Sequence, residues 1–329
     1  MSKTSEKNQT LQINPWHPDK PVSKGATAYH DAVVKSSWLK KAIYELVKVV
    51  NSKICKGDIV VDYGAGTGAS AIFLLKYLRQ RTRLWLVDNS SSWLGKAYEL
   101  LNDPPNVECF ILEKKGNRYA TLSETIGNEV VDHVVSANTV HLISNLKEAF
   151  SGIALALKKE GTFTFQTANL FRNDRPEGIL MIDETVKSVH DIAINIVSRQ
   201  QKFVIYRQGL NERVESEESQ RKFVFPDPRP IEDYLYALKE AGLEHQKSLY
   251  IPVKIKYSDW LNFLRVKRLQ AGILPEIGGK EPSPIEEKDR DTIITMAALE
   301  LFKDLETNNP LADDKSFTVE SVYITSVKK

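Results

Sequence analysis

The segment from Val60 to Gly68, VVDYGAGTG, constrains the fold more than any other part of the chain. A short β-branched run leads directly into three glycines at alternate positions, and an amphipathic helical pattern, ASAIFLLKYL, follows at once. Glycine lets the backbone turn tightly and lets a ligand approach without meeting a Cβ atom. In open α/β sheets, ligands bind outside the carboxyl ends of the strands. The segment therefore predicts a strand–turn–helix unit with a ligand at the turn.

Strand and helix patterns alternate beyond this unit. Strands are expected at about 84–88, 107–113, 131–137 and 161–168, with helices at 90–101 and 146–158. A helix at 231–241, a strand at 243–255 and a strongly β-prone end of the chain at 316–329 continue the pattern. Such alternation is typical of a mainly parallel sheet with helices on both faces. We predict a seven-stranded, doubly wound α/β sheet whose last strand is antiparallel, with helical lid insertions.

The remaining segments are predicted to surround this one α/β domain. Residues 1–28, which are polar and contain Trp16 and His17 among prolines, are expected to be a mobile arm, and a helix should start at about Asp31. Residues 29–169 would form the ligand-binding core and 170–226 a helical lid insertion, with a helix at 178–200 and an exposed charged loop at 211–222. Residues 227–329 would complete the sheet and carry a helical insertion at about 254–312, with helices at 257–270 and 290–305.

Composition excludes several classes of protein. The 45 basic and 43 acidic residues are well mixed along the 329-residue chain, so no basic footprint for nucleic acid is seen. No apolar run approaches the roughly 18 residues of a membrane-spanning helix, and the N-terminal residues do not resemble a signal peptide. Two cysteines, Cys55 and Cys109, are too few for a disulfide scaffold or a four-ligand zinc site. A cytoplasmic protein without a metal site is therefore expected.

Two nucleotide-type ligands compete for the glycine-rich turn. The stretch from Gly64 to Ala69 also satisfies G-x-G-x-x-A, the dinucleotide fingerprint, so an NAD(P)-dependent reductase is one alternative. Asp62, however, ends the first strand beside the place where a pyrophosphate would lie, and its carboxylate would repel that group. A cationic, phosphate-free ligand tolerates the carboxylate. The strand-prone end of the chain is also more than a simple dinucleotide fold needs, so a sulfonium cofactor is favoured.

The turn, with the segments that follow it, resembles a known family. VVDYGAGTG resembles motif I of the class I S-adenosylmethionine-dependent methyltransferases, and Asp88 resembles the ribose-binding acid after the second strand. VDHVVSANTVHLI and GTFTFQTA resemble the fourth and fifth strands with their following segments. The resemblance is good over about 30–170 and loose over 230–329. It is nearest to the small-molecule branch, in which an N-terminal tyrosine and a lid after the fifth strand are common.

The resemblance implies S-adenosylmethionine as cofactor and a role for each matching residue. The turn, with Gly64, Ala65, Gly66 and Gly68, would pack under the methionine and ribose parts, and Asp62 would lie near the amino group. It also implies that Asp88 binds the ribose hydroxyls, Asn89 covers an adenine face and Asn138 contacts the methionine end. The chain departs from the family after the third strand, where Leu112-Glu113-Lys114-Lys115-Gly116 replaces the usual acid-containing pair. Glu113 is assigned to the adenine contact on position alone.

Methyl transfer from a sulfonium is an in-line displacement, so the protein aligns the nucleophile, excludes water and, where needed, removes a proton. His141 is the candidate base because it follows the fourth strand and an imidazole titrates near neutrality; the alternative is a histidine that only packs or hydrogen-bonds. Tyr29 is expected to bind the cofactor carboxylate or to close the pocket, with plain packing as the alternative. His133 is expected to be structural, and His190 to face either the substrate or the core.

The sequence thus predicts a methyltransferase acting at O, N or C of a small organic acceptor, without nucleic-acid or membrane partners. The absence of an Asn/Asp-Pro-Pro-Tyr segment after the fourth strand argues against exocyclic amines of DNA as acceptors. Arg172 and Arg175 at the lid entrance are candidates to recognise an acidic acceptor, with surface solvation as the alternative. Besides the reductase, a protein that keeps the cofactor fold but has a regulatory or non-methyl-transfer role stays open.

Overall fold

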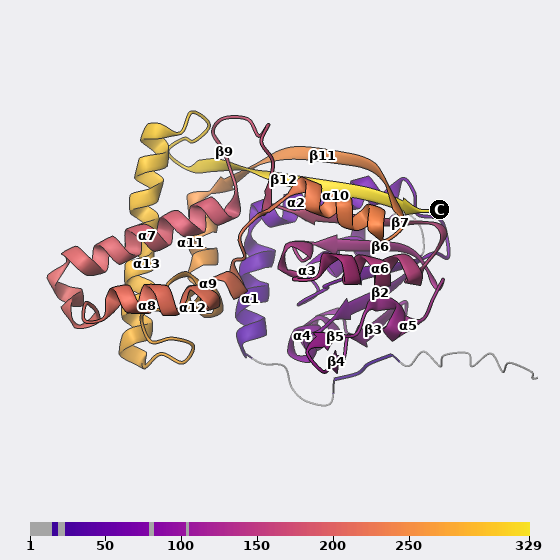
Figure 1. Cartoon of the computed structure of the whole chain (residues 1–329), viewed down its shortest axis with the longest axis horizontal. Coiled ribbons are helices and arrows are strands. Elements are labelled where there is room, and N and C mark those ends of the chain that lie inside the picture. The colour runs from indigo at the N-terminus through magenta and orange to yellow at the C-terminus, as the bar shows by residue number, and fades with distance from the viewer. Residues whose placement is uncertain (1–14, 19–23, 79–81, 103–104) are drawn as a thin grey trace, which may run out of the picture.

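A computed structural model describes residues 15–18, 24–78, 82–102 and 105–329. Its main sheet has seven strands in spatial order, with the short β9 (Ile179–Leu180) added beside β12 (Figure 1). The seven are β11 (Leu243–Lys256), β12 (Ser316–Lys328), β7 (Leu157–Thr167), β6 (Val131–Ala137), β1 (Ile59–Tyr63), β2 (Arg83–Asp88) and β3 (Val107–Ile111). Neighbours from β3 to β7 are parallel, whereas β12 is antiparallel to both β7 and β11. The predicted sheet, with its antiparallel last strand, is confirmed.

Helices cover both faces of this sheet. One face is covered by α2 (Ser37–Asn51), α3 (Ala69–Tyr77) and α4 (Ser91–Leu101), which bury a shared apolar layer against β1, β2 and β3. The other face is covered by α5 (Leu122–Ile126), α6 (Leu146–Ala156) and α10 (Ile231–Glu240). Strands β1, β6 and β7 are buried almost throughout because both of their faces are covered. The doubly wound arrangement therefore follows from their continuous apolar runs.

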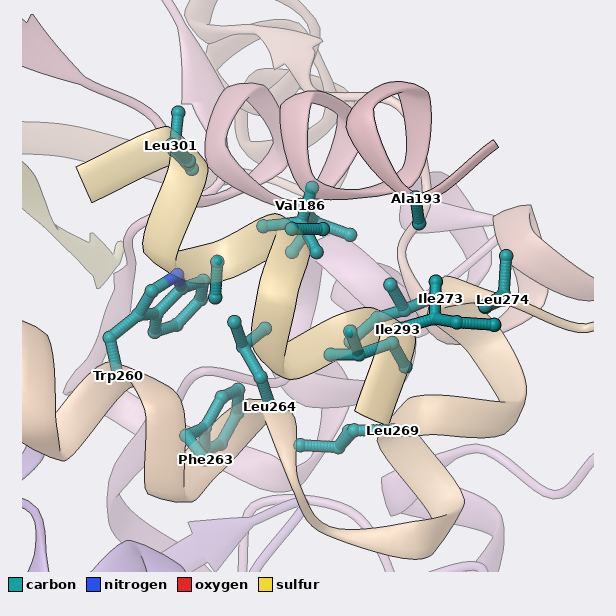
Figure 2. Packing of buried hydrophobic residues seen from close by; sticks show 14 of the residues in the cluster. Val186, Ala193, Trp260, Phe263, Leu264, Leu269, Ile273, Leu274, Ile293 and Leu301 are labelled. Atoms are coloured by element: carbon teal, nitrogen blue, oxygen red, sulfur yellow. The ribbon is translucent and has the colours of Figure 1, made fainter. Parts of the chain in front are cut away.

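Two insertions pack together into a helical lobe beside the sheet (Figure 1). The first follows β7 and contains α7 (Ile182–Arg199), α8 (Leu210–Ser216) and α9 (Glu218–Val224), with a 3-10 helix η2 (Gln201–Tyr206). The second connects β11 to β12 and contains α11 (Tyr257–Leu264), α12 (Lys267–Ile273) and α13 (Pro284–Asn308). Figure 2 shows α13 between α7 and the α11–α12 pair, with Val186, Trp260, Leu264 and Ile293 in the shared core. The helices α7 to α9 and α11 to α13 together form this helical lobe.

The structure differs from the sequence expectation at several element boundaries. The helix expected from about Asp31 is two helices, α1 (Lys24–Lys35) and α2, because Ser36 between them has an extended backbone. The expected loop at 211–222 is wrong: α8 and α9 form there, although no side chain of α9 is buried. The expected helix at 257–270 is α11 followed by α12.

Part of the arm expected at 1–28 has a defined place in the fold, and residues 24–28 belong to α1. The Trp16 N–H donates to the carbonyl oxygen of Cys109 at 2.6 Å, and the His17 ring meets the edge of Tyr98, so residues 15–18 lie against β3 and α4. Residues 1–14 and 19–23 lie outside the described residues. Within the described ranges, no helix has both the length and the apolar character that crossing a bilayer requires.

Candidate active site

The glycine-rich turn connects β1 to α3 at the carboxyl edge of the sheet. Gly64, Gly66 and Gly68 have φ angles of +74°, +55° and +80°, which L side chains rarely adopt. A Cβ on Gly64 would lie 2.1 Å from Cγ2 of Thr139, and one on Gly68 would lie 2.9 Å from Cβ of Ala97. The turn therefore allows close approach of Thr139, which follows β6, and of Ala97 on α4, and a side chain at Gly64 or Gly68 would be strained.

Asp62 lies fully buried at the end of β1, directly before the turn. Its Oδ2 accepts a hydrogen bond of 2.6 Å from the Ser70 hydroxyl, whereas its Oδ1 has no hydrogen-bond partner. Burial raises the pKa of the Asp62 carboxyl to about 7, the bond from Ser70 opposes this, and the charge of Asp88 adds to it. An unsatisfied buried carboxylate oxygen is costly. Such an oxygen is a place for a ligand that brings a hydrogen-bond donor or a positive charge.

Asp88 ends β2 on the other side of the turn. Its Oδ2 accepts the backbone N–H of Gly66 and its Oδ1 accepts that of Ser90, both at 2.8 Å. Burial raises the pKa of Asp88 in spite of these bonds and of the positive charge of Arg268. A carboxylate has about four acceptor sites, so these bonds, with a third from the backbone of Asn89, leave acceptor capacity for a ligand such as a diol.

The other predicted cofactor residues lie around the same edge. Ala65 is buried and its N–H donates to the carbonyl oxygen of Val87, which holds the turn against β2. Asn89 follows Asp88 and is exposed. Asn138 directly follows β6 with a φ of +50°, and its N–H donates to the carbonyl oxygen of Gln166. The structure therefore brings these residues together at one edge of the sheet.

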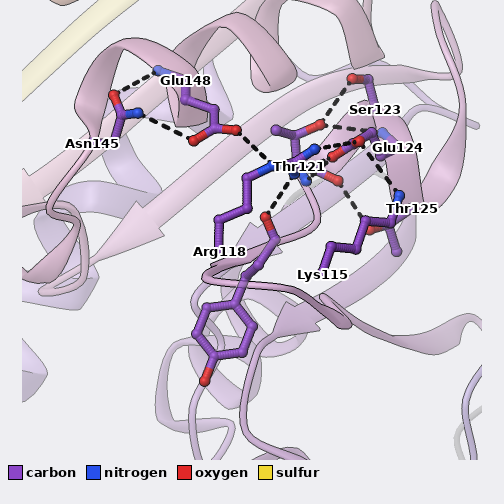
Figure 3. A network of polar contacts seen from close by, with 9 residues as sticks. Lys115, Arg118, Thr121, Ser123, Glu124, Thr125, Asn145 and Glu148 are labelled. Carbon is purple, nitrogen blue, oxygen red and sulfur yellow. Dashed lines mark hydrogen bonds and ion pairs between the residues drawn. The ribbon is translucent and has the colours of Figure 1, made fainter.

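Glu113, just beyond β3, is exposed, and its carbonyl oxygen accepts the N–H of Ala120. The residues between them form the short hairpin of β4 (Lys114–Lys115) and β5 (Arg118–Tyr119). Figure 3 shows how Arg118 fixes this hairpin through ion pairs with Glu124 on α5 and Glu148 on α6. Where the sequence departs from the family pattern, the chain thus forms a charged hairpin that is held by its own ion pairs.

His141 lies in η1 (Val140–Leu142), between β6 and α6. Its Nδ1 is 3.0 Å from the hydroxyl oxygen of Thr167 at the end of β7, a bond that either tautomer can make. Burial lowers the pKa of His141 to about 4, and the positive charge of Arg229 adds to this. This lowered pKa runs against the expectation that His141 titrates near neutrality, and its role as a base stays a prediction. At pH 7 it carries a neutral imidazole.

An aromatic stack from three elements covers the turn. Tyr29 on α1 packs against Trp93 on α4 with ring centroids 4.5 Å apart, and Phe263 on α11 lies 6.4 Å from Tyr29. A Cβ on Gly66 would lie 3.3 Å from the Trp93 ring. The guanidinium of Arg268 on α12 lies over the same ring, 4.4 Å from its centroid. The helical lobe and α1 therefore reach the glycine-rich turn through this stack.

Residues 60–161, from β1 into β7, match the family model of a methyltransferase domain. Residues 60–161 are therefore similar to a methyltransferase domain. The strand order, with an antiparallel strand β12 between β7 and β11, agrees with this assignment. Methyltransferase domains of this fold use S-adenosylmethionine as methyl donor, so the likeness of residues 60–161 points to this cofactor.

Solved structures show the same fold at low sequence identity. A Bacillus halodurans protein described provisionally as a methyltransferase is 15% identical, with a TM-score of 0.51; the match covers 87% of this chain and 98% of that chain. A Galdieria sulphuraria protein described provisionally as a sarcosine dimethylglycine methyltransferase is 11% identical, with a TM-score of 0.51, over 93% of this chain and 99% of that chain. No curated protein matches the sequence.

The residues at the edge of the methyltransferase domain fit S-adenosylmethionine. The free Oδ1 of Asp62 offers an acceptor for an ammonium group, and Asp88 keeps acceptor capacity for a ribose diol. His30 on α1, which the resemblance places beside the cofactor with plain packing as the alternative, contacts the turn: its Nδ1 lies 3.1 Å from the Thr67 hydroxyl. Burial lowers the pKa of His30, which favours the uncharged ring.

Three further predictions concerned charged side chains away from the turn. Arg172 donates to both carboxylate oxygens of Glu320 at 2.7 Å, and Arg175 pairs with Glu184. Both guanidinium groups are thus engaged by carboxylates, so the reading of these arginines as receptors for an acidic acceptor is not supported. His190 faces the buried Glu276 at 3.2 Å, which places it in the core of the helical lobe.

His133 is structural, as expected, because its ring bonds Thr162 and Asp58 at 2.7 and 3.0 Å.

Sequence reasoning missed Ser70, Trp93 and Arg268. Ser70 has a local signal, since a hydroxyl two residues after the last glycine falls in the first turn of α3 beneath Asp62. Trp93 lies in the first turn of α4, five residues after Asp88, where an aromatic ring can reach the turn. Arg268 has no such signal, because only the packing of the helical lobe brings it there.

Proposed function

We propose that this chain transfers the methyl group of S-adenosylmethionine to O, N or C of a small organic acceptor, in a pocket between the glycine-rich turn and the helical lobe. The observation that carries the proposal is the buried Oδ1 of Asp62, which has no hydrogen-bond partner beside a turn of three left-handed glycines. A cationic ligand satisfies that oxygen, whereas a pyrophosphate would place negative charge beside it. This favours a sulfonium cofactor over a dinucleotide.

Each predicted site residue then has a task. When bound, S-adenosylmethionine supplies an electrophilic methyl group on a positively charged sulfur. Asp62 accepts from the ammonium group, Asp88 accepts from the ribose hydroxyls, and Asn138 contacts the methionine end. Gly64 and Gly66, with Ala65 and Gly68, leave the room that these contacts need, while Asn89 and Glu113 border the adenine.

His141 and Tyr29 serve the acceptor side of the proposed mechanism. Because the pKa of His141 is lowered to about 4, its neutral imidazole accepts a hydrogen bond from an acceptor O–H or N–H and orients the nucleophile, and it holds a full proton only weakly. Tyr29, stacked on Trp93, excludes water from the turn. Alignment and exclusion of water are the main requirements of an in-line displacement with a good leaving group.

Calorimetric titration of the full chain with S-adenosylhomocysteine and with NADH tests the cofactor. We expect binding of S-adenosylhomocysteine that is lost in Asp62→Asn and retained in Asp304→Asn, which replaces an exposed carboxylate on α13. Binding of NADH without S-adenosylhomocysteine would reverse the proposal in favour of a reductase. Mass spectrometry of candidate acceptors incubated with S-adenosylmethionine, read as a gain of one CH₂, tests the transfer. Cofactor binding with no gain across acceptor classes would favour a regulatory role or another reaction.

The proposal extends to partner and compartment. The balanced charge of the chain supports a small molecule rather than a nucleic acid as acceptor. Cys55 is an exposed thiol, which supports a reducing compartment such as the cytoplasm.

A further inference from the structure

A cavity of about 490 Å³ in the helical lobe lies between α9, α12 and α13. Four cationic side chains line it, namely Lys267, Arg268, Lys280 and Arg290, against the single carboxylate of Glu287. Glu287 forms an ion pair with Lys267. The cavity wall therefore carries an excess of positive charge that the described side chains lining it do not neutralise.

Arg290 is the most buried of these cations. Its side chain is 2% exposed, and its Nε and Nη2 donate to the backbone carbonyls of Ile277 and Gly279. Carbonyl groups satisfy the donors but leave the charge of the guanidinium in place. Burial lowers the pKa of Arg290, and the carboxylates of Glu286 and Glu276 oppose this. A fixed positive charge thus lies at the inner wall.

The outer wall of the cavity is apolar. Phe223 on α9 is 78% exposed although it lines the cavity, and Val224 and Ala271 lie beside it. Val224 packs closely on α12: a Cβ atom added to Gly272 would lie 2.4 Å from the Cβ atom of Val224. This contact holds α9 over the cavity. An exposed aromatic ring beside a group of cations suits a ligand with an apolar body and an anionic group.

Arg268 connects this cavity with the glycine-rich turn. It lines the cavity, and its guanidinium lies 4.4 Å from the ring centroid of Trp93, which in turn covers Gly66. Its positive charge also lowers the pKa values of Asp88 and Tyr29 against the rise that burial causes, so it lies within electrostatic reach of both. A ligand held by Arg268 in the cavity therefore lies beside the cofactor residues.

We propose that the methyl acceptor is an amphiphilic organic anion, a carboxylate or a phosphate ester, whose charged group is held by Arg268, Lys280 and Arg290 and whose apolar body lies on Phe223. This inference rests on the proposed methyl transfer for the identity of the ligand as acceptor. The cavity's preference for an organic anion is a separate property that can be measured without turnover.

The experiment titrates the full chain, with and without S-adenosylhomocysteine, with four probes of similar tail length: octanoate, octyl phosphate, octanol and octyltrimethylammonium. We expect the two anions to bind at least tenfold more tightly than the neutral and cationic probes, because only they complement the cationic wall. The tighter of the two anions identifies the charged group. Arg268→Gln and Phe223→Ala should each weaken anion binding about tenfold or more, by removing the charge and the apolar wall respectively.

The matched control is Arg199→Gln, which removes an exposed arginine of the same lobe that pairs with Glu300 outside the cavity. It should leave anion binding unchanged. Equal binding of octanol and octanoate, or equal losses in Arg199→Gln and Arg268→Gln, would overturn the inference. Binding of the anions without binding of S-adenosylhomocysteine would support the anion site in the cavity but refute the proposed methyl transfer. Binding of S-adenosylhomocysteine without binding of the anions would refute the anion site alone.

Discussion

Replacement of Asp62 by asparagine tests the electrostatics of the turn in the empty protein. The pKa of Asp62 rises from an ordinary 3.8 to about 7 on folding, because the carboxyl is buried with one oxygen unpaired. The folded state therefore binds a proton more tightly than the unfolded state, and each pKa unit corresponds to about 1.36 kcal/mol. The whole shift corresponds to about 4 kcal/mol. This contribution is fully present below about pH 4, falls as the pH rises and is lost above about pH 7.

Urea unfolding of wild type and Asp62→Asn at pH 5 and pH 8 measures the effect. Asparagine does not titrate, so the difference between the two proteins isolates Asp62. From pH 5 to pH 8, we expect the free energy of unfolding of the wild type minus that of the variant to fall by about 3 kcal/mol. The variant should be the more stable protein at pH 8 if its amide oxygen keeps the bond from Ser70.

Asp304→Asn, on the exposed face of α13, should show no comparable change in the same comparison. A wild-type-minus-variant difference that stays constant between pH 5 and pH 8 would refute the reasoning, because the Asp62 carboxyl would then ionise alike in the folded and unfolded chains.

Three further substitutions test other parts of the site. Gly64→Ala places a Cβ 2.1 Å from Thr139 Cγ2 at a φ of +74°, so we expect a loss of about 1–3 kcal/mol in urea unfolding and weaker S-adenosylhomocysteine binding; an unchanged midpoint would contradict the close approach. The NMR signals of His141, assigned by their loss in His141→Asn, should titrate near pH 4, and a midpoint near 6.5 would show that the ring is not desolvated. Glu276→Gln leaves Arg221 without its buried carboxylate, so cleavage by trypsin within α8 and α9 should accelerate, while the exposed Glu218→Gln should cleave at the wild-type rate.

The sheet and the cofactor edge were predictable because their signals are local. A β-branched run, a turn of glycines and a helical pattern lie within 60–77, and the strand that ends at Asp88 has the same kind of neighbours. Parallel strands bring their carboxyl ends to one edge, so Asp62, Asp88 and Asn138 converge as a consequence of topology. No knowledge of the helical insertions is needed for this step.

The acceptor side could not be predicted in the same way. Arg268 reaches Trp93 only because α12 packs on α1 as well as on the following helix α13, and both α1 and α4 are far from α12 in the sequence. The pKa of His141 depends on its burial and on Arg229, neither of which the segment SANTVHLI reveals. The helices α8 and α9 have almost no apolar stripe, so the hydrophobic periodicity of the sequence predicts a loop there. Tertiary packing decides each of these features.

The raised pKa of Asp62 also sharpens the choice between the two cofactor classes. An ionised carboxylate repels a pyrophosphate, but near pH 7 about half of the empty protein carries a neutral, protonated Asp62. A cation then selects the ionised form and releases about 0.5 proton at pH 7, whereas an anionic ligand at this position would select the protonated form and take up a proton. Phosphate and Tris buffers differ in their ionisation enthalpies. Calorimetry of S-adenosylhomocysteine binding at pH 7 in both buffers therefore measures how many protons are released or taken up on binding. Proton release that disappears in Asp62→Asn is expected. Proton uptake, or release that persists in the variant, would remove the ammonium–Asp62 contact from the site.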